Sequence, residues 1–325
     1  MKRRVLLQTC GALAGAALCE SVAAQQWPSK TVTVIVPFAA GGGTTDPLAR
    51  LMAEELSKSL GATFVVDNKP GANGSIGAAY VKNAAPDGHV LLFTAAGTMA
   101  TNLALYKTLP YHPQKDFEPI VLVGHVANVL VVNPALPATN VKEFVDYLKK
   151  NPGKTNFATT GNGSSMHTAA ELFSQATQTS MTHVPFNGAG PATTSLLSGE
   201  VSVMFHLVPG IATQVKAGKV KALAVMAPKR SPALPDVPTM AEAGFPNIES
   251  YTWLCFVAPK GTPKAVVDSL NGAVNKILAQ PALRERLAGM GVEPMGGTPA
   301  EFATFRDSEI KKWGEVVRRA GVTID

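Results

Sequence analysis

The sequence predicts an α/β protein made of two similar lobes. Short runs rich in β-branched residues alternate with stretches of helical periodicity, which is the pattern of parallel sheets covered by helices. This alternation occurs twice along the chain. Two long apolar segments, residues 120–132 and 251–258, follow the two blocks. They are expected to be the two crossings that join the lobes at a hinge.

Each block can be divided into elements by its periodicity. The first block predicts strands 31–36, 63–66 and 90–94, helix 75–83, and helix 47–60 with Leu48, Leu51, Met52 and Leu56 on one face. The second block predicts strands 156–159, 181–184, 201–205 and 220–225, with helices 166–176, 189–197 and 210–217. Helical runs near 263–279 and 299–320 are expected to return to the first lobe.

Residues 1–24 have the order of a secretory signal peptide. Basic residues at 2–4 precede an apolar run, and small residues at 22–24 precede Gln25. We expect cleavage near Ala24 and a periplasmic mature protein, exported by either the general secretory or the twin-arginine route. A lipid anchor on Cys19 is the alternative. The expected organisation is then signal peptide 1–24, first lobe 25–124, second lobe 125–252 and a return to the first lobe over 253–325.

Charge and cysteine content narrow the class of protein. The formal net charge of +6 falls to +4 without the three basic residues and the one acidic residue of the leader. No basic cluster longer than two residues remains, so nucleic-acid binding is not expected. The mature chain keeps one cysteine, Cys255, in an apolar run. An internal disulfide is therefore excluded, and a buried, unreactive thiol is expected.

A glycine-rich loop follows the first expected strand. Glycines 41–43 allow a tight backbone turn, and Asp46 with Pro47 makes a good N-cap and first-turn pair for the next helix. A strand end, a glycine turn and a helix N-terminus together favour a carboxylate or phosphate by roughly 0.3–1 kcal/mol when exposed. A plain turn that needs glycine only for its geometry is the alternative.

Two junctions in the second block have the same character. Residues 187–190 repeat the glycine turn, residues 159–167 are rich in glycine and small hydroxyls, and each segment joins an expected strand to an expected helix. Loops that follow parallel strands lie at one edge of their sheet. Both lobes can therefore direct their loops into one cleft.

The same loops lack the signatures of nucleotide, metal and catalytic sites. The first has neither the lysine of a Walker loop nor G-x-G-x-x-G spacing, and the six histidines show no spacing typical of metal ligands. Ser164 or Ser165 with His167 forms a Ser/His neighbourhood without the G-x-S-x-G elbow. We expect no cofactor, no metal and no enzyme activity, with a Ser/His hydrolase as the alternative.

The chain resembles the Bug/TctC family of periplasmic solute-binding proteins, some of which serve tripartite tricarboxylate transporters. The resemblance covers the mature chain through VPFAAGGG, TDPLAR, VDNKPGANGSIGAAYV, APDGHVLLF, NFATTGNGSSMHTAAELF, HVPFNGAGPATTSLLSGEVSVMF and PKRSPALPDVPTMAEAGFP. It implies a periplasmic-binding-protein-like Venus flytrap, in which two α/β lobes are joined by two hinge crossings and close on a small carboxylate.

Carried over by position, the resemblance implies a set of ligand-binding residues on facing loops. They are Phe38, Ala39, Gly41, Gly42, Gly43, Thr44, Thr45, Asp46, Thr94, Thr98, Thr159, Thr160, Gly161, Ser164, His167, Phe186, Asn187, Gly188, Ala189 and His206. The implied partners are a small carboxylate-type ligand and membrane transporter subunits, for a monomeric protein. A sensor that presents its ligand to a membrane kinase is the alternative.

Two departures from the family pattern affect these expectations. The first glycine loop is one residue longer than in many relatives, which would displace its contacts. His206 stands where many relatives carry aspartate. Loss of that acid disfavours a ligand with an amine, although His206 can equally be a solvated or structural residue.

Overall fold

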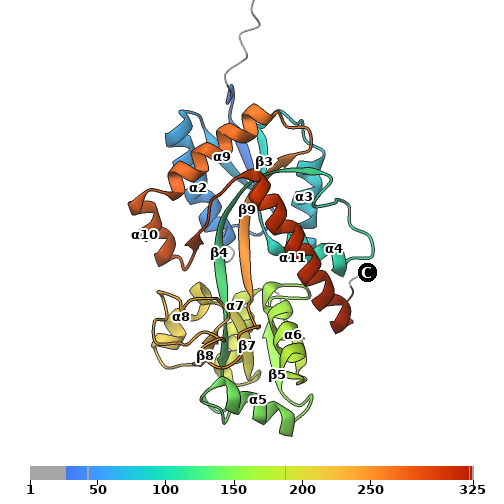
Figure 1. Ribbon diagram of the computed structural model, residues 1–325, viewed down its shortest axis with the longest axis vertical. Helices are drawn as coiled ribbons and strands as arrows, with labels where there is room; N and C mark the ends of the chain where they lie inside the picture. The colour runs from blue at the N-terminus through green and yellow to red at the C-terminus, as the bar shows by residue number, and fades with distance from the viewer. Residues whose placement is uncertain (1–26, 42–43, 187, 322, 324–325) are drawn as a thin grey trace, which may run out of the picture.

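The structure is a computed structural model that describes residues 27–41, 44–186, 188–321 and 323. The expected signal peptide and the predictions at Gly42, Gly43 and Asn187 lie outside the described residues. The chain forms two α/β lobes, one above the other in Figure 1, joined by the long strands β4 (Phe117–Val132) and β9 (Tyr251–Pro259). The predicted fold class is confirmed.

The first lobe is built on a mixed sheet that begins as a parallel one. β1 (Val32–Val36) is parallel to both β2 (Phe64–Asn68) and β3 (Val90–Ala95). β9 joins β3 in the antiparallel sense, and β4 lies beyond β9. The short strand β10 (Glu293–Pro294) pairs with β4. The loops after β1, β2 and β3 therefore leave the sheet at the same edge.

The second lobe has its own sheet and shares β4 with the first. From Asn128 onward β4 pairs with β7 (Val203–Leu207) and with β8 (Lys221–Val225) instead of β9. β7 is parallel to β5 (Asn156–Thr159), and β5 is parallel to β6 (Thr182–Pro185). The loops after β5 and β6 again leave the sheet at one edge.

Helices pack on both sheets (Figure 1). Those of the first lobe are α2 (Thr45–Leu60), the short η1 (Ala72–Gly74), α3 (Ser75–Lys82), η2 (Gly97–Thr101), α4 (Asn102–Leu105), α9 (Lys264–Leu278), α10 (Pro281–Gly289) and α11 (Pro299–Ala320). Those of the second lobe are α5 (Val141–Lys150), α6 (Ser165–Thr177), α7 (Ala189–Ser198) and α8 (Val208–Lys216). None of the described helices is long and apolar enough to cross a bilayer.

Helix α5 was not predicted from the sequence. The Asn140 side chain caps it by accepting a hydrogen bond from the Glu143 amide at 2.9 Å. Its buried residues are Val141, Phe144, Val145 and Leu148, which follow helical spacing. The capping asparagine and the apolar spacing are both present in the sequence, so local pattern alone is sufficient to predict this helix.

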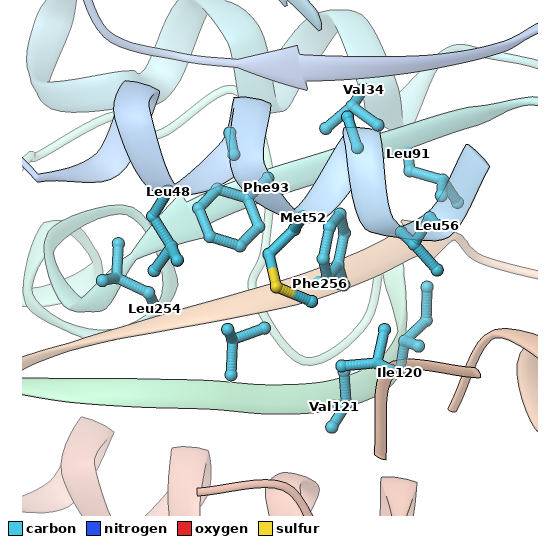
Figure 2. Packing of buried hydrophobic residues seen from close by; sticks show 14 of the residues in the cluster. Val34, Leu48, Met52, Leu56, Leu91, Phe93, Ile120, Val121, Leu254 and Phe256 are labelled. Carbon is cyan, nitrogen blue, oxygen red and sulfur yellow. The ribbon is translucent and has the colours of Figure 1, made fainter. Parts of the chain in front are cut away.

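One of the two apolar cores of the first lobe lies between α2 and the sheet. Leu48, Met52 and Leu56 point from α2 toward the strands, and the rings of Phe93 and Phe256 pack there with centroids 4.7 Å apart (Figure 2). All five side chains are fully buried. Each contributes about 1.5–3 kcal/mol through removal of apolar surface from water. This packing fixes the start of α2, and with it the glycine loop that precedes the helix.

The chain passes from the first-lobe sheet to the second-lobe sheet at Asn128, where hydrogen bonds hold it in place. The Asn128 amide donates to the Ser250 carbonyl at 3.0 Å, Asn128 Nδ2 donates to the Phe205 carbonyl at 2.8 Å, and Ser250 Oγ donates to Asn128 Oδ1 at 3.2 Å. Asn128 lies on β4, and Ser250 precedes β9. The lobe boundaries expected at 124/125 and 252/253 stay a prediction, and both lie within a few residues of this contact.

The last helix, α11, packs on the first lobe and also reaches the second. Gln175 Nε2 on α6 donates to the Val316 carbonyl of α11 at 3.0 Å. Lys312 Nζ donates to the Glu249 carbonyl, next to the change of sheet, at 3.0 Å. A groove of about 460 Å³ lies between α6 and α11, and none of the sequence-predicted site residues lines it.

Candidate functional site

The loop between β1 and α2 differs from its sequence prediction at the helix start. The sequence assigns Asp46 as N-cap and Pro47 as the first helical residue. In the structure α2 begins at Thr45, and Thr44 is the N-cap without a side-chain hydrogen bond. The N-cap prediction is therefore wrong. Asp46 lies inside the first turn, where its carboxylate has other partners.

The Asp46 carboxylate holds this loop together. Through Oδ2 it accepts hydrogen bonds from the Gly41 amide at 2.8 Å and from Arg50 Nε at 3.0 Å. Through Oδ1 it accepts one from Asn68 Nδ2 at 2.8 Å, and the same amide group donates to the Phe38 carbonyl at 2.9 Å. Asp46 therefore ties both sides of the glycine turn to the helix and to β2.

The charge of Asp46 is stabilised by these contacts. Burial alone raises the pKa of its carboxyl group, but hydrogen bonds from Arg50, Asn68 and Gly41 outweigh burial and hold the pKa below its ordinary value. The side chain is 1% exposed. Both carboxylate oxygens accept hydrogen bonds within the protein, so Asp46 holds the shape of the loop between β1 and α2.

A second loop at the same edge was absent from the sequence-predicted site. Residues 71–75 follow β2, and Ala72 and Asn73 have left-handed backbone conformations with φ of 46° and 49°. Such conformations cost about 1–2 kcal/mol per non-glycine residue and are concentrated at functional sites. The available signal was the sequence GANGS immediately after a strand.

Side-chain amides connect this second loop to the loop after β3. Asn102 Nδ2 donates to the Asn73 carbonyl at 3.0 Å and to the Tyr111 hydroxyl oxygen at 3.1 Å, and that hydroxyl donates to the Thr98 carbonyl at 2.6 Å. Burial raises the pKa of Tyr111, so the phenol stays protonated and able to donate. The network makes the two loops one unit.

The loops of the first lobe approach one another closely. A Cβ added to Gly74 would meet Thr98 Oγ1 and would lie 3.4 Å from Pro37. Only glycine fits here, and its φ of 87° points to the same requirement. Thr94 and Thr98 are both fully buried. Thr98 Oγ1 donates to the Asn73 carbonyl at 3.3 Å, whereas Thr94 Oγ1 has no partner among the described residues.

In the second lobe, the loop between β5 and α6 is closed by side chains at its two ends. Ser164 is the N-cap of α6, and its Oγ accepts a hydrogen bond from the His167 amide at 3.3 Å. His167 Nδ1 accepts one from the Gly163 amide at 3.1 Å. Thr159 Oγ1 contacts the Gly161 amide at 3.1 Å. Substitution of Ser164 would therefore remove a helix cap.

The imidazole of His167 is not arranged as a catalytic base. Its Nδ1 is occupied by the Gly163 amide, and its Nε2 lies 3.7 Å from Glu171 Oε1. The Ser164 hydroxyl oxygen is occupied by a backbone amide. Burial, and then the neighbouring His183, lower the pKa of His167 to about 4. A Ser/His hydrolase finds no support in this geometry.

The loop after β6 leads directly into α7. The Phe186 amide donates to the Thr159 carbonyl at 2.9 Å, which holds this loop against the loop after β5. Gly188 has a φ of 111°, and a Cβ added there would meet no atom within 4 Å. Backbone strain, rather than a steric contact, is what a larger residue would meet at Gly188. Ala189 is the first residue of α7.

One loop of the second lobe contacts the first lobe. A Cβ added to Gly163 of the second lobe would clash with the Leu105 side chain at the end of α4 in the first lobe. Leu105 follows η2, which begins at the loop after β3. This contact brings the loop between β5 and α6 against the first-lobe segment that follows β3.

Residues 48–322 match the family described as the tripartite tricarboxylate transporter family receptor, TctC. The chain belongs to this family. Protein BugT of Bordetella pertussis is 36% identical over 313 residues, which cover 96% of each chain. A Rhodopseudomonas palustris protein solved with adipate has a TM-score of 0.84 at 37% identity, covering 92% of this chain and 100% of that one. MatC from the same organism, solved with bound malate, has a TM-score of 0.78 at 37% identity, covering 90% and 100%.

His206, which the resemblance implies is a ligand-binding residue, is buried and has both ring nitrogens within hydrogen-bond distance of protein oxygens. It is 2% exposed, with Nδ1 2.9 Å from the Leu207 carbonyl oxygen and Nε2 3.2 Å from Thr193 Oγ1. A carbonyl can only accept, so Nδ1 carries the proton and Nε2 accepts from threonine. Burial lowers the pKa of His206. The ring is neutral at physiological pH and shielded from solvent.

The TctC receptor carries no lysine or arginine within the loops after β1, β5 and β6. Arg50, at the edge of the first loop, is held by Asp46 and by Asn68 Oδ1. No group of histidine, cysteine, aspartate or glutamate side chains in the described part of the chain could hold a metal ion. The polar groups of these loops include backbone amides, hydroxyls and the side-chain amides of Asn162 and Asn187, and the loops lead into the N-termini of α2, α6 and α7.

Proposed function

We propose that this receptor captures a small dicarboxylate between its lobes in the periplasm and delivers it to the membrane subunits of a tripartite transporter. The observation that carries the proposal is that three loops without cationic side chains each lead into a helix N-terminus, and that one of them contacts the other lobe through Gly163 and Leu105. The adipate and malate bound by related receptors support the ligand class.

Backbone amides can hold a carboxylate without an ion pair. The first amides of a helix have no intrahelical acceptor, and the helix dipole adds about 0.3–1 kcal/mol of attraction for an anion, rising to about 2 kcal/mol in a partly buried site. Two opposed clusters of such donors suit an anion with a carboxylate at each end. Bound water would complete the contacts that amides and hydroxyls leave open.

Capture requires the lobes to move together. The sheets meet at the contact between Asn128 and Ser250, so rotation about this position would bring the loop clusters together while each core stays intact. Closure would be driven by contacts that the ligand makes with both lobes at once. The membrane subunits would then recognise the closed receptor.

Calorimetry and thermal unfolding with a matched ligand set test the proposal. Adipate and malate are the probes, and adipamide, which has the same length without charge, is the control. A diacid at 100 times its dissociation constant should add about 2.7 kcal/mol to the free energy of unfolding. Equal stabilisation by adipamide, or no stabilisation by any linear diacid of four to six carbons, would refute the carboxylate proposal.

A further inference from the structure

Two stacked imidazoles lie beneath the loop between β5 and α6. The rings of His167 and His183 have centroids 4.0 Å apart and planes 12° apart. Phe157 stacks on His183 at 5.0 Å. The three rings come from α6, β6 and β5, and the parallel register pairs Phe157 with His183. The stack is thus set by the sheet and by the first turn of α6.

Each imidazole is bonded to one end of the loop. His167 Nδ1 accepts from the Gly163 amide at 3.1 Å. His183 Nε2 lies 2.6 Å from Thr159 Oγ1, and the same hydroxyl oxygen lies 3.1 Å from the Gly161 amide nitrogen. Gly161 and Gly163 have positive φ values of 122° and 73°. The loop contains two glycines that leave its backbone free to adopt other conformations. Its two ends are nevertheless fixed, one by His167 Nδ1 directly and the other by His183 Nε2 through the Thr159 hydroxyl.

We propose that His167 and His183 are positioning residues for solute binding, and that they hold the backbone of residues 160–163 in the shape that receives a carboxylate. This inference rests on the proposed function for its ligand. Neither ring needs to contact the solute, since each acts through the loop. We call the two rings and their hydrogen bonds to Gly163 and Thr159 the clamp. Because the clamp fixes Gly163, it also sets the contact between Gly163 and Leu105 across the lobes.

The clamp depends on a neutral His167 ring. Nδ1 can accept the Gly163 hydrogen bond only while it carries no proton, which places the ring proton on Nε2, facing Glu171 Oε1 at 3.7 Å. The other titratable group against the ring is His183. Phe157, the α4 residue Leu105 and the α11 residues Val316, Val317 and Ala320, which surround the site, carry no charge.

Burial keeps the ring in this state. The pKa of His167 is lowered to about 4, first by burial and then by His183, and burial raises the pKa of Glu171. At neutral pH the Gly163 hydrogen bond is intact. Below about pH 4 the proton on Nδ1 removes the acceptor and releases the loop.

A role in packing alone predicts different behaviour from a clamp. His167→Phe keeps a ring in the stack and removes the acceptor. His167→Asn gives up the ring and can present Oδ1 near the position of Nδ1. If the clamp is correct, the His167→Asn variant keeps the hydrogen bond to Gly163 and the His167→Phe variant loses it. If the ring matters only for packing, His167→Phe should preserve the loop better than His167→Asn.

The test uses the mature protein without ligand, by amide hydrogen exchange and by nitrogen NMR of the histidine rings. We expect an unprotonated Nδ1 for His167 at pH 7, and exchange at Gly163 about fivefold or more faster in His167→Phe than in His167→Asn. His183→Gln can keep a hydrogen-bonding group near the position of Nε2, so the Gly161 amide should exchange more slowly in this variant than in His183→Phe. His112→Asn, which changes a first-lobe histidine that is not part of the stack, is the control.

Equal rates of amide exchange at Gly163 in the two His167 variants, or a faster rate in His167→Asn, would overturn the clamp. Titrations with adipate and malate add the functional arm, in which His167→Phe should bind at least about fivefold more weakly than His167→Asn. Binding that is equal in both variants, despite different exchange, overturns the positioning role. If wild-type protein binds no organic acid while the exchange pattern holds, the proposed function fails and the clamp remains.

Discussion

Replacing Asp46 by asparagine should destabilise the first lobe although the two side chains have the same shape. Every group around the carboxylate is a donor, namely the Gly41 amide, Arg50 Nε and Asn68 Nδ2. Whichever way the asparagine amide is turned, its NH₂ group faces at least one donor at 2.8–3.0 Å. One hydrogen bond is replaced by a repulsive contact, and the remaining bonds lose their charge.

The magnitude follows from burial. Hydrogen bonds to a charged group contribute about 1.5–3 kcal/mol each, and removal of one partner of a buried charged pair costs about 3–5 kcal/mol. Asp46 is buried, but the Arg50 side chain is 51% exposed and can return to water. We therefore expect a loss near the lower end of this range, about 3 kcal/mol of unfolding free energy.

Urea unfolding at pH 7, followed by circular dichroism, measures this loss. The control is Asp268→Asn, which breaks an exposed pair with Lys264 at 2.6 Å on α9 and should change stability by less than about 0.5 kcal/mol. The pKa of Asp46 is lowered in the folded state, so its contribution is complete above the unfolded pKa and is lost as pH falls through the folded value. A loss below about 1 kcal/mol for Asp46→Asn would refute the argument.

Four further outcomes can be measured on the same protein. Because burial lowers the pKa of both His125 and His167 to about 4, the unfolded chain binds more protons between about pH 6.5 and pH 4, and stability should fall as pH falls across this window in urea titrations. Gly74→Ala should lower the melting temperature, because its Cβ meets Thr98 Oγ1, and Thr98→Ser should not relieve the clash, since the oxygen remains. Small-angle scattering should give a smaller radius of gyration when a diacid binds, and an unchanged profile at saturation would contradict hinge closure. Intact mass of the protein recovered from a periplasmic fraction should show cleavage after Ala24, and an uncut or acylated N-terminus would contradict the predicted export.

Local patterns in the sequence were enough to predict most of the architecture. Apolar residues recur with a period of two in strands and of 3.6 in helices, and this period shows which side of each element is buried. The buried face of α2, with Leu48, Met52 and Leu56, and the parallel strands beside it therefore follow from residue spacing. The loops after β1, β5 and β6 could be located because glycine and small hydroxyls mark strand-to-helix turns. Cys255 is buried, as its apolar neighbours predict.

Tertiary structure alone decided what the polar residues of those loops do. Asp46 looks like a helix cap in sequence, but Asn68, which follows it by 22 residues on another strand, completes its hydrogen bonds. His206 could have been solvated, and a threonine from α7 fixes it as a buried neutral ring. His167 acquires its low pKa from burial and from His183 on a separate strand.

The physical reason is the range of the interactions. Helix and strand preferences depend on neighbours within about four residues, so the chain carries them in its local order. Hydrogen bonds and pKa values depend on which atoms lie within a few ångströms, and the fold brings those atoms together from distant positions. The sequence by itself therefore determined the two lobes and where their loops lie, and only the packed structure decided which polar residues hold those loops in place.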